Sequence, residues 1–115
     1  MPFLKVYSNA ELKDKNAEQF TERAAELVAH KLEKPIGYVV VSPARETSMS
    51  FGGSSETKGV LAYVDSIGFN DKQGLIKLLT EFFYERFENV ELNNINIVAT
   101  SLPASEVAIA GRFLG

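Results

Sequence analysis

Three short, nearly continuous apolar runs limit what this chain can fold into. They are Tyr38-Val39-Val40-Val41, Val60-Leu61-Ala62-Tyr63-Val64 and Ile95-Asn96-Ile97-Val98-Ala99. Short runs rich in β-branched and aromatic residues are typical of strands, and the lack of strict alternation indicates strands that are buried on both faces. A sheet built from them must therefore be covered on each side.

Two longer segments carry an apolar residue every three or four positions, which predicts helices over residues 14–33 and 70–88. Caps are expected from Asn16 with Gln19 and from Asn70-Asp71-Lys72-Gln73. The apolar stripes are Ala17, Phe20, Ala24, Leu27, Val28 and Leu32 in the first segment, and Leu75, Leu78, Leu79, Phe82, Phe83 and Phe87 in the second.

The elements repeat one plan twice. Strands are predicted over residues 2–7, 38–43, 59–66 and 94–100, so each predicted helix lies between two strands. The fold class is therefore α+β, with two βαβ units that form a four-stranded mixed sheet and two helices on one face. Two helices leave the other face open, and we expect another subunit to cover it because monomers rarely expose apolar patches beyond ~300–600 Å².

Length and composition exclude several classes of function. The 115 residues indicate one domain over 1–115, and a net charge of −3 provides no basic surface for nucleic acid. With no cysteine and a single histidine, His30, which we expect to be solvated, we expect no metal and no triad catalysis. No apolar run approaches the ~20 residues of a membrane span or forms a signal peptide, so we expect a cytoplasmic protein without membrane partners.

The connection between the two units, residues 42–59, is long for a loop. We expect a short strand over Ser48–Phe51. The Gly52-Gly53-Ser54-Ser55 run lacks the Gly-Lys-Ser/Thr ending of a phosphate-binding loop, so a tight turn is the better interpretation.

The first residues, Met1-Pro2-Phe3, lead directly into the first predicted strand. Removal of Met1 would leave a secondary amine on Pro2, held by a rigid ring and able to act as a base. Proline also suits the first position of a strand for purely structural reasons. Lys34 has two interpretations as well: it complements the negative end of the first helix, and it places a cation near the sheet edge where Pro2 begins.

These residues together resemble the macrophage migration inhibitory factor family of the tautomerase superfamily, which includes D-dopachrome tautomerase. The resemblance spans nearly the whole chain, and its most specific segment is Phe-Gly-Gly-Ser-Ser-Glu. It rests on Pro2-Phe3-Leu4, Lys34-Pro35 with Tyr38, Phe51-Gly52-Gly53-Ser54-Ser55-Glu56, Ser66-Ile67-Gly68 and Ile95-Asn96.

The resemblance implies a homotrimer with an active site at each subunit interface and no cofactor. Pro2 would be the catalytic base, and Lys34 with the Ile67 backbone amide would contact the substrate's oxygens. Asn96 would come from the neighbouring subunit. The implied activity is keto–enol tautomerisation of a small 2-oxo acid such as phenylpyruvate.

Some positions depart from the family pattern. Asn94 replaces the tyrosine of the animal proteins, so we expect a weaker preference for aryl substrates. The tail over residues 107–113 differs, and Lys58-Gly59-Val60-Leu61 replaces a Cys-x-x-Cys motif, so thiol oxidoreductase activity should be absent.

Two other functions remain open. One is a trimeric cytokine-like signalling protein, with a receptor that the sequence does not identify and a vestigial pocket. The other is dehalogenation or decarboxylation, which would require arginine in the pocket, supplied by Arg45 or Arg112.

Overall fold

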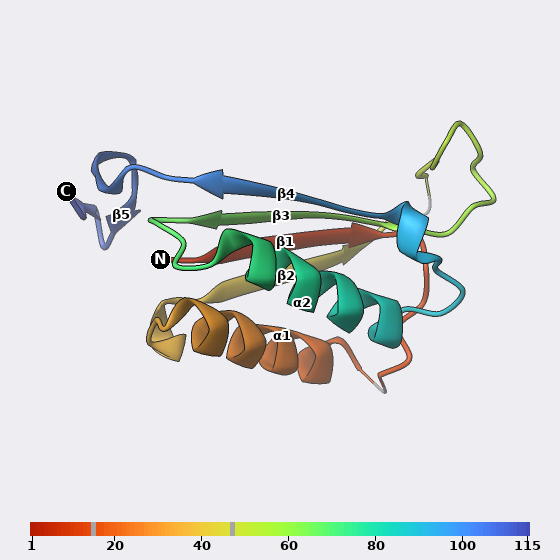
Figure 1. Ribbon diagram of the computed structural model, residues 1–115, viewed down its shortest axis with the longest axis horizontal. Coiled ribbons are helices and arrows are strands. Elements are labelled where there is room, and N and C mark those ends of the chain that lie inside the picture. Colours follow the sequence, from red (N-terminus) through yellow and green to blue (C-terminus); the bar gives the residue numbers. More distant parts are fainter. Residues whose placement is uncertain (15, 47) are drawn as a thin grey trace.

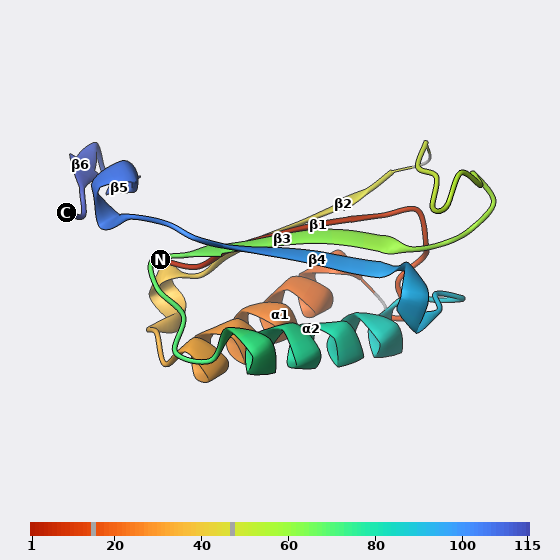
Figure 2. The same ribbon diagram turned by 45° about the horizontal axis from the view of Figure 1, so that its top comes forward.

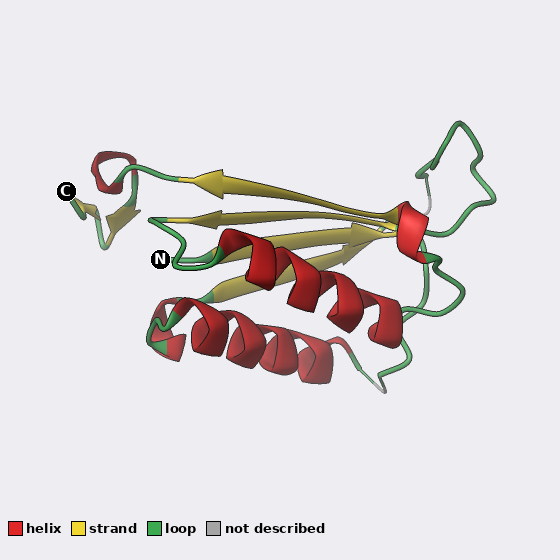
Figure 3. Cartoon of the chain, viewed as in Figure 1, coloured by secondary structure: helices red, strands yellow, loops and turns green. Residues whose placement is uncertain are grey.

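A computed structural model describes residues 1–14, 16–46 and 48–115 of the protein. Figure 1 traces the elements along the chain, and Figure 3 distinguishes helices from strands. The main elements are β1 (Phe3–Ser8), α1 (Ala17–Leu32), β2 (Val40–Arg45), β3 (Val60–Ser66), α2 (Lys72–Arg86) and β4 (Ile95–Ser101), followed by the short strands β5 (Ala108–Ile109) and β6 (Arg112–Phe113).

The four long strands form one mixed sheet in the order β2-β1-β3-β4. β1 is parallel to β2, β3 is parallel to β4, and the two halves meet through the antiparallel pair of β1 and β3. Both helices pack on the same face of this sheet (Figure 2). The predicted pair of βαβ units with two helices on one face is therefore confirmed.

The hydrophobic core lies between the helices and the sheet. Its side chains alternate along the strands and recur at helical spacing, because only one face of each element is buried. Phe20 of α1 packs against Phe82 and Phe87, with ring centroids 5.4 and 5.5 Å apart. The most deeply buried core residues include Leu4, Val6, Phe20, Val28, Val60, Val64, Leu75, Leu79 and Phe83.

Both helices are shorter than the sequence pattern suggested, because their caps fix their ends. The Asn16 side chain accepts a hydrogen bond from the Gln19 amide at 2.9 Å, and Asp71 accepts one from the Gly74 amide at 3.0 Å. These caps confirm the predicted capping residues, and each helix begins directly after its cap, at Ala17 and Lys72 rather than at residues 14 and 70. α1 ends where Glu33 adopts a left-handed conformation, with φ of 54°.

Short 3-10 turns shift the starts of two strands. Ile36–Tyr38 forms such a turn after Pro35, so β2 begins at Val40 rather than at residue 38. Leu92–Asn94 forms another, so β4 begins at Ile95. A 3-10 turn uses its backbone amides locally, which removes them from the sheet.

The long connection contains a turn rather than a strand. The predicted strand over Ser48–Phe51 is wrong, since only Phe51 makes an isolated bridge, to Ser54. Gly52 and Gly53 have φ of 62° and 85° between these two residues, as the expected tight turn requires.

The face of the sheet opposite the helices is open within one chain, so the predicted burial of both faces depends on a second copy of the chain. Figure 2 shows the four strands with the helices beneath them. Apolar Val40 and Val98 are 53% and 45% exposed there. Polar side chains alternate with the apolar ones on this face, at Lys5, Ser42, Asp65, Asn96 and Thr100. The sequence runs are almost continuously apolar, so this alternation of polar and apolar side chains was not predicted from them.

The second helix also contains one misassigned residue. Leu78 was placed on the apolar face, yet it is 39% exposed, whereas its neighbour Leu79 is fully buried. The helical step of about 100° between consecutive residues separates the two leucines, and the sheet covers only one of them.

This pair of leucines provides a test of the packing. Leu79→Ala should lower the free energy of unfolding by ~2–5 kcal/mol, because it leaves a cavity in a fully packed core. The matched change Leu78→Ala should cost less than about 0.5–1 kcal/mol, since the side chain contacts solvent. Urea unfolding followed by circular dichroism measures both. Equal losses for the two variants would contradict the packing of α2 described above.

Candidate functional site

The site forms where the chain begins. Pro2 is fully buried, and its carbonyl oxygen accepts a hydrogen bond from the Val40 amide at 3.1 Å. Because β1 is a central strand, paired on both sides, this end of the chain is held firmly. Met1 precedes it and lies partly exposed at the wall of a cavity.

Lys34 reaches the same cavity from the end of α1. Its backbone amide donates to the Ala29 carbonyl at 3.0 Å, which closes the helix. Pro35 and the turn after it then carry Tyr38 to the cavity wall. The two interpretations of Lys34 are compatible, since the residue both ends the helix and lines the cavity.

Ile67 follows β3 directly and lines the cavity from a third direction. The Ser66 carbonyl accepts a hydrogen bond from the Leu102 amide at 2.8 Å, which joins the ends of β3 and β4. The C-terminal tail closes the rim, and Figure 1 shows it at the same end of the sheet as the N-terminus. The cavity measures about 380 Å³ and is lined by Met1, Lys34, Pro35, Tyr38, Ile67, Ala104, Ile109 and Leu114.

The electrostatics of this cavity favour a neutral amine. Burial lowers the pKa of the Met1 α-amine below its ordinary value of 8.0, and the nearby charge of Lys34 lowers this pKa further. In a chain without Met1, the terminal amine would be that of Pro2, at the start of the buried strand β1. A free base beside a fixed cation is an arrangement that can remove a proton next to a carbonyl group and stabilise the resulting charge.

Asn96 does not belong to this cavity within one chain. Asn96 pairs with Leu61 near the start of β3, whereas the cavity lies beyond Ser66. The five-residue separation corresponds to roughly 16 Å along a strand. Asn94 lies at the same distant end as Asn96. A site that contains both Lys34 and Asn96 therefore needs two copies of the chain.

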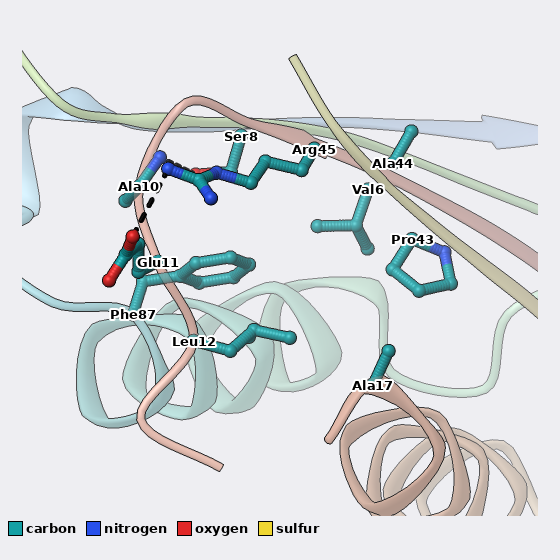
Figure 4. A pocket seen from close by; sticks show the side chains of 10 residues that line it. All are labelled: Val6, Ser8, Ala10, Glu11, Leu12, Ala17, Pro43, Ala44, Arg45 and Phe87. Carbon is teal, nitrogen blue, oxygen red and sulfur yellow. Dashed lines mark hydrogen bonds and ion pairs between the residues drawn. The ribbon is translucent and has the colours of Figure 1, made fainter. Parts of the chain in front are cut away.

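A second cavity of about 330 Å³ lies between the ends of β1 and β2 and the start of α1 (Figure 4). Its charged residues, Arg45 and Glu11, pair with each other at 3.3 Å. The Ser8 hydroxyl donates to the Gly59 carbonyl at 2.6 Å. Because these polar groups already pair with each other or with the backbone, this cavity has fewer groups that could bind a substrate than the first cavity.

Neither candidate arginine lines the first cavity. Arg45 stands at the second cavity, and Arg112 lies in β6 of the tail. Within the chain as described, this placement does not favour the dehalogenase or decarboxylase alternatives.

Sequence reasoning missed the apolar wall supplied by the tail. Ala104, Ile109 and Leu114 line the cavity, although the tail had been noted only for its departure from the family pattern. The apolar residues of the tail were the available signal, because a terminal segment of this kind normally packs against something.

Comparison with known proteins identifies the chain's relatives. The family profile described as Macrophage migration inhibitory factor (MIF) matches residues 1–115. No curated protein sequence matches the chain. None of the described helices is long and apolar enough to cross a membrane.

Solved structures show the same fold. A homologue of macrophage migration inhibitory factor from Prochlorococcus marinus has a TM-score of 0.87 at 21% identity, covering 98% of this chain and 99% of that one. The factor from Trichinella spiralis has a TM-score of 0.84 at 22% identity, covering 96% and 98%. A protein inactivated by 2-oxo-3-pentynoate has a TM-score of 0.81 at 18% identity, covering 95% and 93%.

The influence of Lys34 on the amine is testable in the Met1-retaining protein. Lys34→Gln should raise the pKa of the α-amine partway toward 8.0, because it removes a like charge and leaves burial, the larger cause, in place. NMR of the ¹³C-dimethylated amine across pH measures this value. Lys58→Gln, at the far loop, is the matched control and should leave it unchanged. An unchanged pKa of the α-amine in Lys34→Gln would contradict the proximity of the two groups.

Proposed function

The chain belongs to the macrophage migration inhibitory factor family, and on that basis we propose that it is a cofactor-independent keto–enol tautomerase of small 2-oxo acids. Pro2, freed by removal of Met1, acts as the general base. Lys34 and the Ile67 backbone amide bind the substrate's oxygens, and Asn96 of a neighbouring subunit completes the site.

The observation that carries this proposal is the environment of the N-terminal amine. The chain begins in a cavity where burial and Lys34 both lower the pKa of an amine. Burial and a neighbouring cation both disfavour the protonated form of an amine and so raise its free-base fraction near neutral pH. That state is the one a general base requires.

The reaction needs only this amine and the oxygen-binding groups. The nitrogen lone pair of Pro2 takes the C3 proton of the 2-oxo acid, and the electrons of the C–H bond form the C2–C3 double bond. Negative charge moves to the C2 oxygen, where Lys34 and the Ile67 amide stabilise it. The oxygen then takes a proton from water to give the enol. In the reverse direction, protonated Pro2 returns the proton to C3.

The choice of substrate class rests on the lining of the cavity. One cation lies among apolar walls, which suits a small acid with an apolar side chain. A protein of similar fold is inactivated by 2-oxo-3-pentynoate, itself a 2-oxo acid. Both observations support a small 2-oxo acid, and phenylpyruvate is the test substrate proposed.

The proposal includes a homotrimer, the assembly typical of this family, because Asn96 and Lys34 lie at opposite ends of one sheet and one copy cannot supply both to the same site. The open face, where Val40 and Val98 are about half exposed, offers a surface for subunit contact. In a closed cyclic assembly, every subunit buries the same surface in the same way.

Light scattering tests the assembly. The protein should have three times the 12.7 kDa mass of one chain. Val98→Glu should weaken the assembly, because it brings like charges into the contact between open faces. Leu78→Glu, on the outer surface of α2, is the control with similar exposure and should leave the mass unchanged. A stable monomer of the unmodified protein at micromolar concentration would refute the shared site.

The role of the amine is tested by comparing two forms of one protein. The trimmed form, confirmed by mass spectrometry, should tautomerise phenylpyruvate, with a rate that rises with pH as the Pro2 amine loses its proton. The Met1-retaining form should be inactive, because its Pro2 nitrogen is an amide without basicity. Pro2→Gly should lose at least about tenfold in kcat while keeping its assembly, since a more mobile primary amine replaces the ring.

Equal rates for the trimmed and Met1-retaining forms would show that Pro2 is not the base. A trimmed, trimeric protein without activity would favour the cytokine-like signalling alternative, in which the cavity has no catalytic role.

A further inference from the structure

One buried hydroxyl next to the site has no partner. Ser66 is 0% exposed, and its Oγ makes no hydrogen bond with any described residue. The Ser66 carbonyl, by contrast, accepts from the Leu102 amide. Buried hydroxyls are normally paired, and leaving one unpaired destabilises the folded state. An unpaired hydroxyl at this position therefore requires an explanation.

The strand register places this hydroxyl beside Pro2. In the antiparallel pair of β1 and β3, Phe3 lies opposite Asp65 and Leu4 opposite Val64. One step further along both chains brings Pro2 opposite Ser66. Pro2 and Ser66 also share the helix-facing side of the sheet with buried Leu4 and Val64, since side chains two positions apart point the same way. Directly opposed side chains in such a pair approach closely.

The chemistry of Pro2 accounts for the unpaired Ser66 hydroxyl in the chain that retains Met1. While Met1 is present, the Pro2 nitrogen is a tertiary amide with neither a hydrogen to donate nor a free lone pair. Removal of Met1 gives a secondary amine with one N–H and one lone pair. A neighbouring oxygen can then accept the N–H, which directs the lone pair elsewhere.

We propose that Ser66 is a positioning residue whose Oγ accepts the N–H of the trimmed Pro2 and so directs the nitrogen lone pair into the cavity. This inference rests on the proposed function of Pro2. When the nitrogen takes a proton from substrate, one N–H remains on Ser66 and the other is the proton that returns to carbon. Ser66 itself gains and loses no proton. Removal of Met1 thus gives the buried Ser66 hydroxyl a hydrogen-bond partner, the N–H of Pro2.

Other charged and titratable groups act on the same amine. Lys34 and Tyr38 line the cavity, and Asp65 adjoins Ser66 on the other face of the sheet. Lys34 disfavours the protonated amine, whereas an acceptor oxygen favours it. Loss of the Ser66 hydroxyl should therefore lower the pKa of the Pro2 amine, as the charge of Lys34 does.

Titration of the amine tests the inference without any need for catalysis. In trimmed protein labelled with ¹⁵N-proline, Ser66→Ala should lower the pKa of the Pro2 amine by about one unit, a tenfold change in the protonation constant. The midpoint of the pH–rate profile should move by the same amount, and kcat should fall. Ser101→Ala, at the exposed position that pairs with Ser66 in β4, is the matched control and should change neither value.

Thermal unfolding adds a second readout. Ser66→Ala should leave the Met1-retaining protein as stable as before or more stable, because it removes an unpaired hydroxyl. The same change should destabilise the trimmed protein, where the hydroxyl is paired.

The inference is overturned if Ser66→Ala leaves both the pKa of the Pro2 amine and the pH–rate midpoint unchanged, even when kcat falls. It is also overturned if the change affects the stability of the two forms equally. A trimmed protein without tautomerase activity would refute the proposed function alone, since the titration still decides the role of Ser66.

Discussion

The antiparallel pairing of β1 with β3 is the contact on which the rest of the structure depends. It joins the two βαβ units into one sheet and places β1 at the centre, with β2 on its other side. A strand paired on both sides is hard to displace, so the residue just before it is held in place too. The position of Pro2 at the head of β1, next to Met1 at the cavity wall, and of Ser66 opposite Pro2, follows from this register.

The sequence allowed the order and type of the main elements to be predicted, because helical and strand periodicities survive without tertiary information. It did not reveal which side of a strand was open. The run over residues 95–99 reads as apolar, yet Asn96 and Val98 lie on the uncovered face. Likewise, nothing in the local pattern distinguished exposed Leu78 from buried Leu79. Burial depends on which neighbour covers a residue, and local periodicity does not contain that information.

The candidate site was predictable only in part for a similar reason. Pro2, Lys34 and Ile67 were identified through short motifs, and the first two also through their chemistry; the structure brings their segments to one cavity. The wall formed by the tail was missed, because its contribution arises from contact between the two ends of the chain. Asn96 lies apart from this cavity within one copy, so its proposed role depends on a second copy of the chain. Distances between copies are set by assembly, which a single sequence does not encode locally.

The central position of β1 also determines the order of events during synthesis. β1 is made first, yet its partner β3 begins more than fifty residues later, so the central strand lacks one of its two neighbours until about half of the chain has been made. Once the sheet closes, Pro2 is buried and the bond before it is held at the cavity wall. An aminopeptidase therefore has its best access to Met1 on the nascent chain. Slow processing or fast folding would then leave a fraction of the folded chains with Met1 in place.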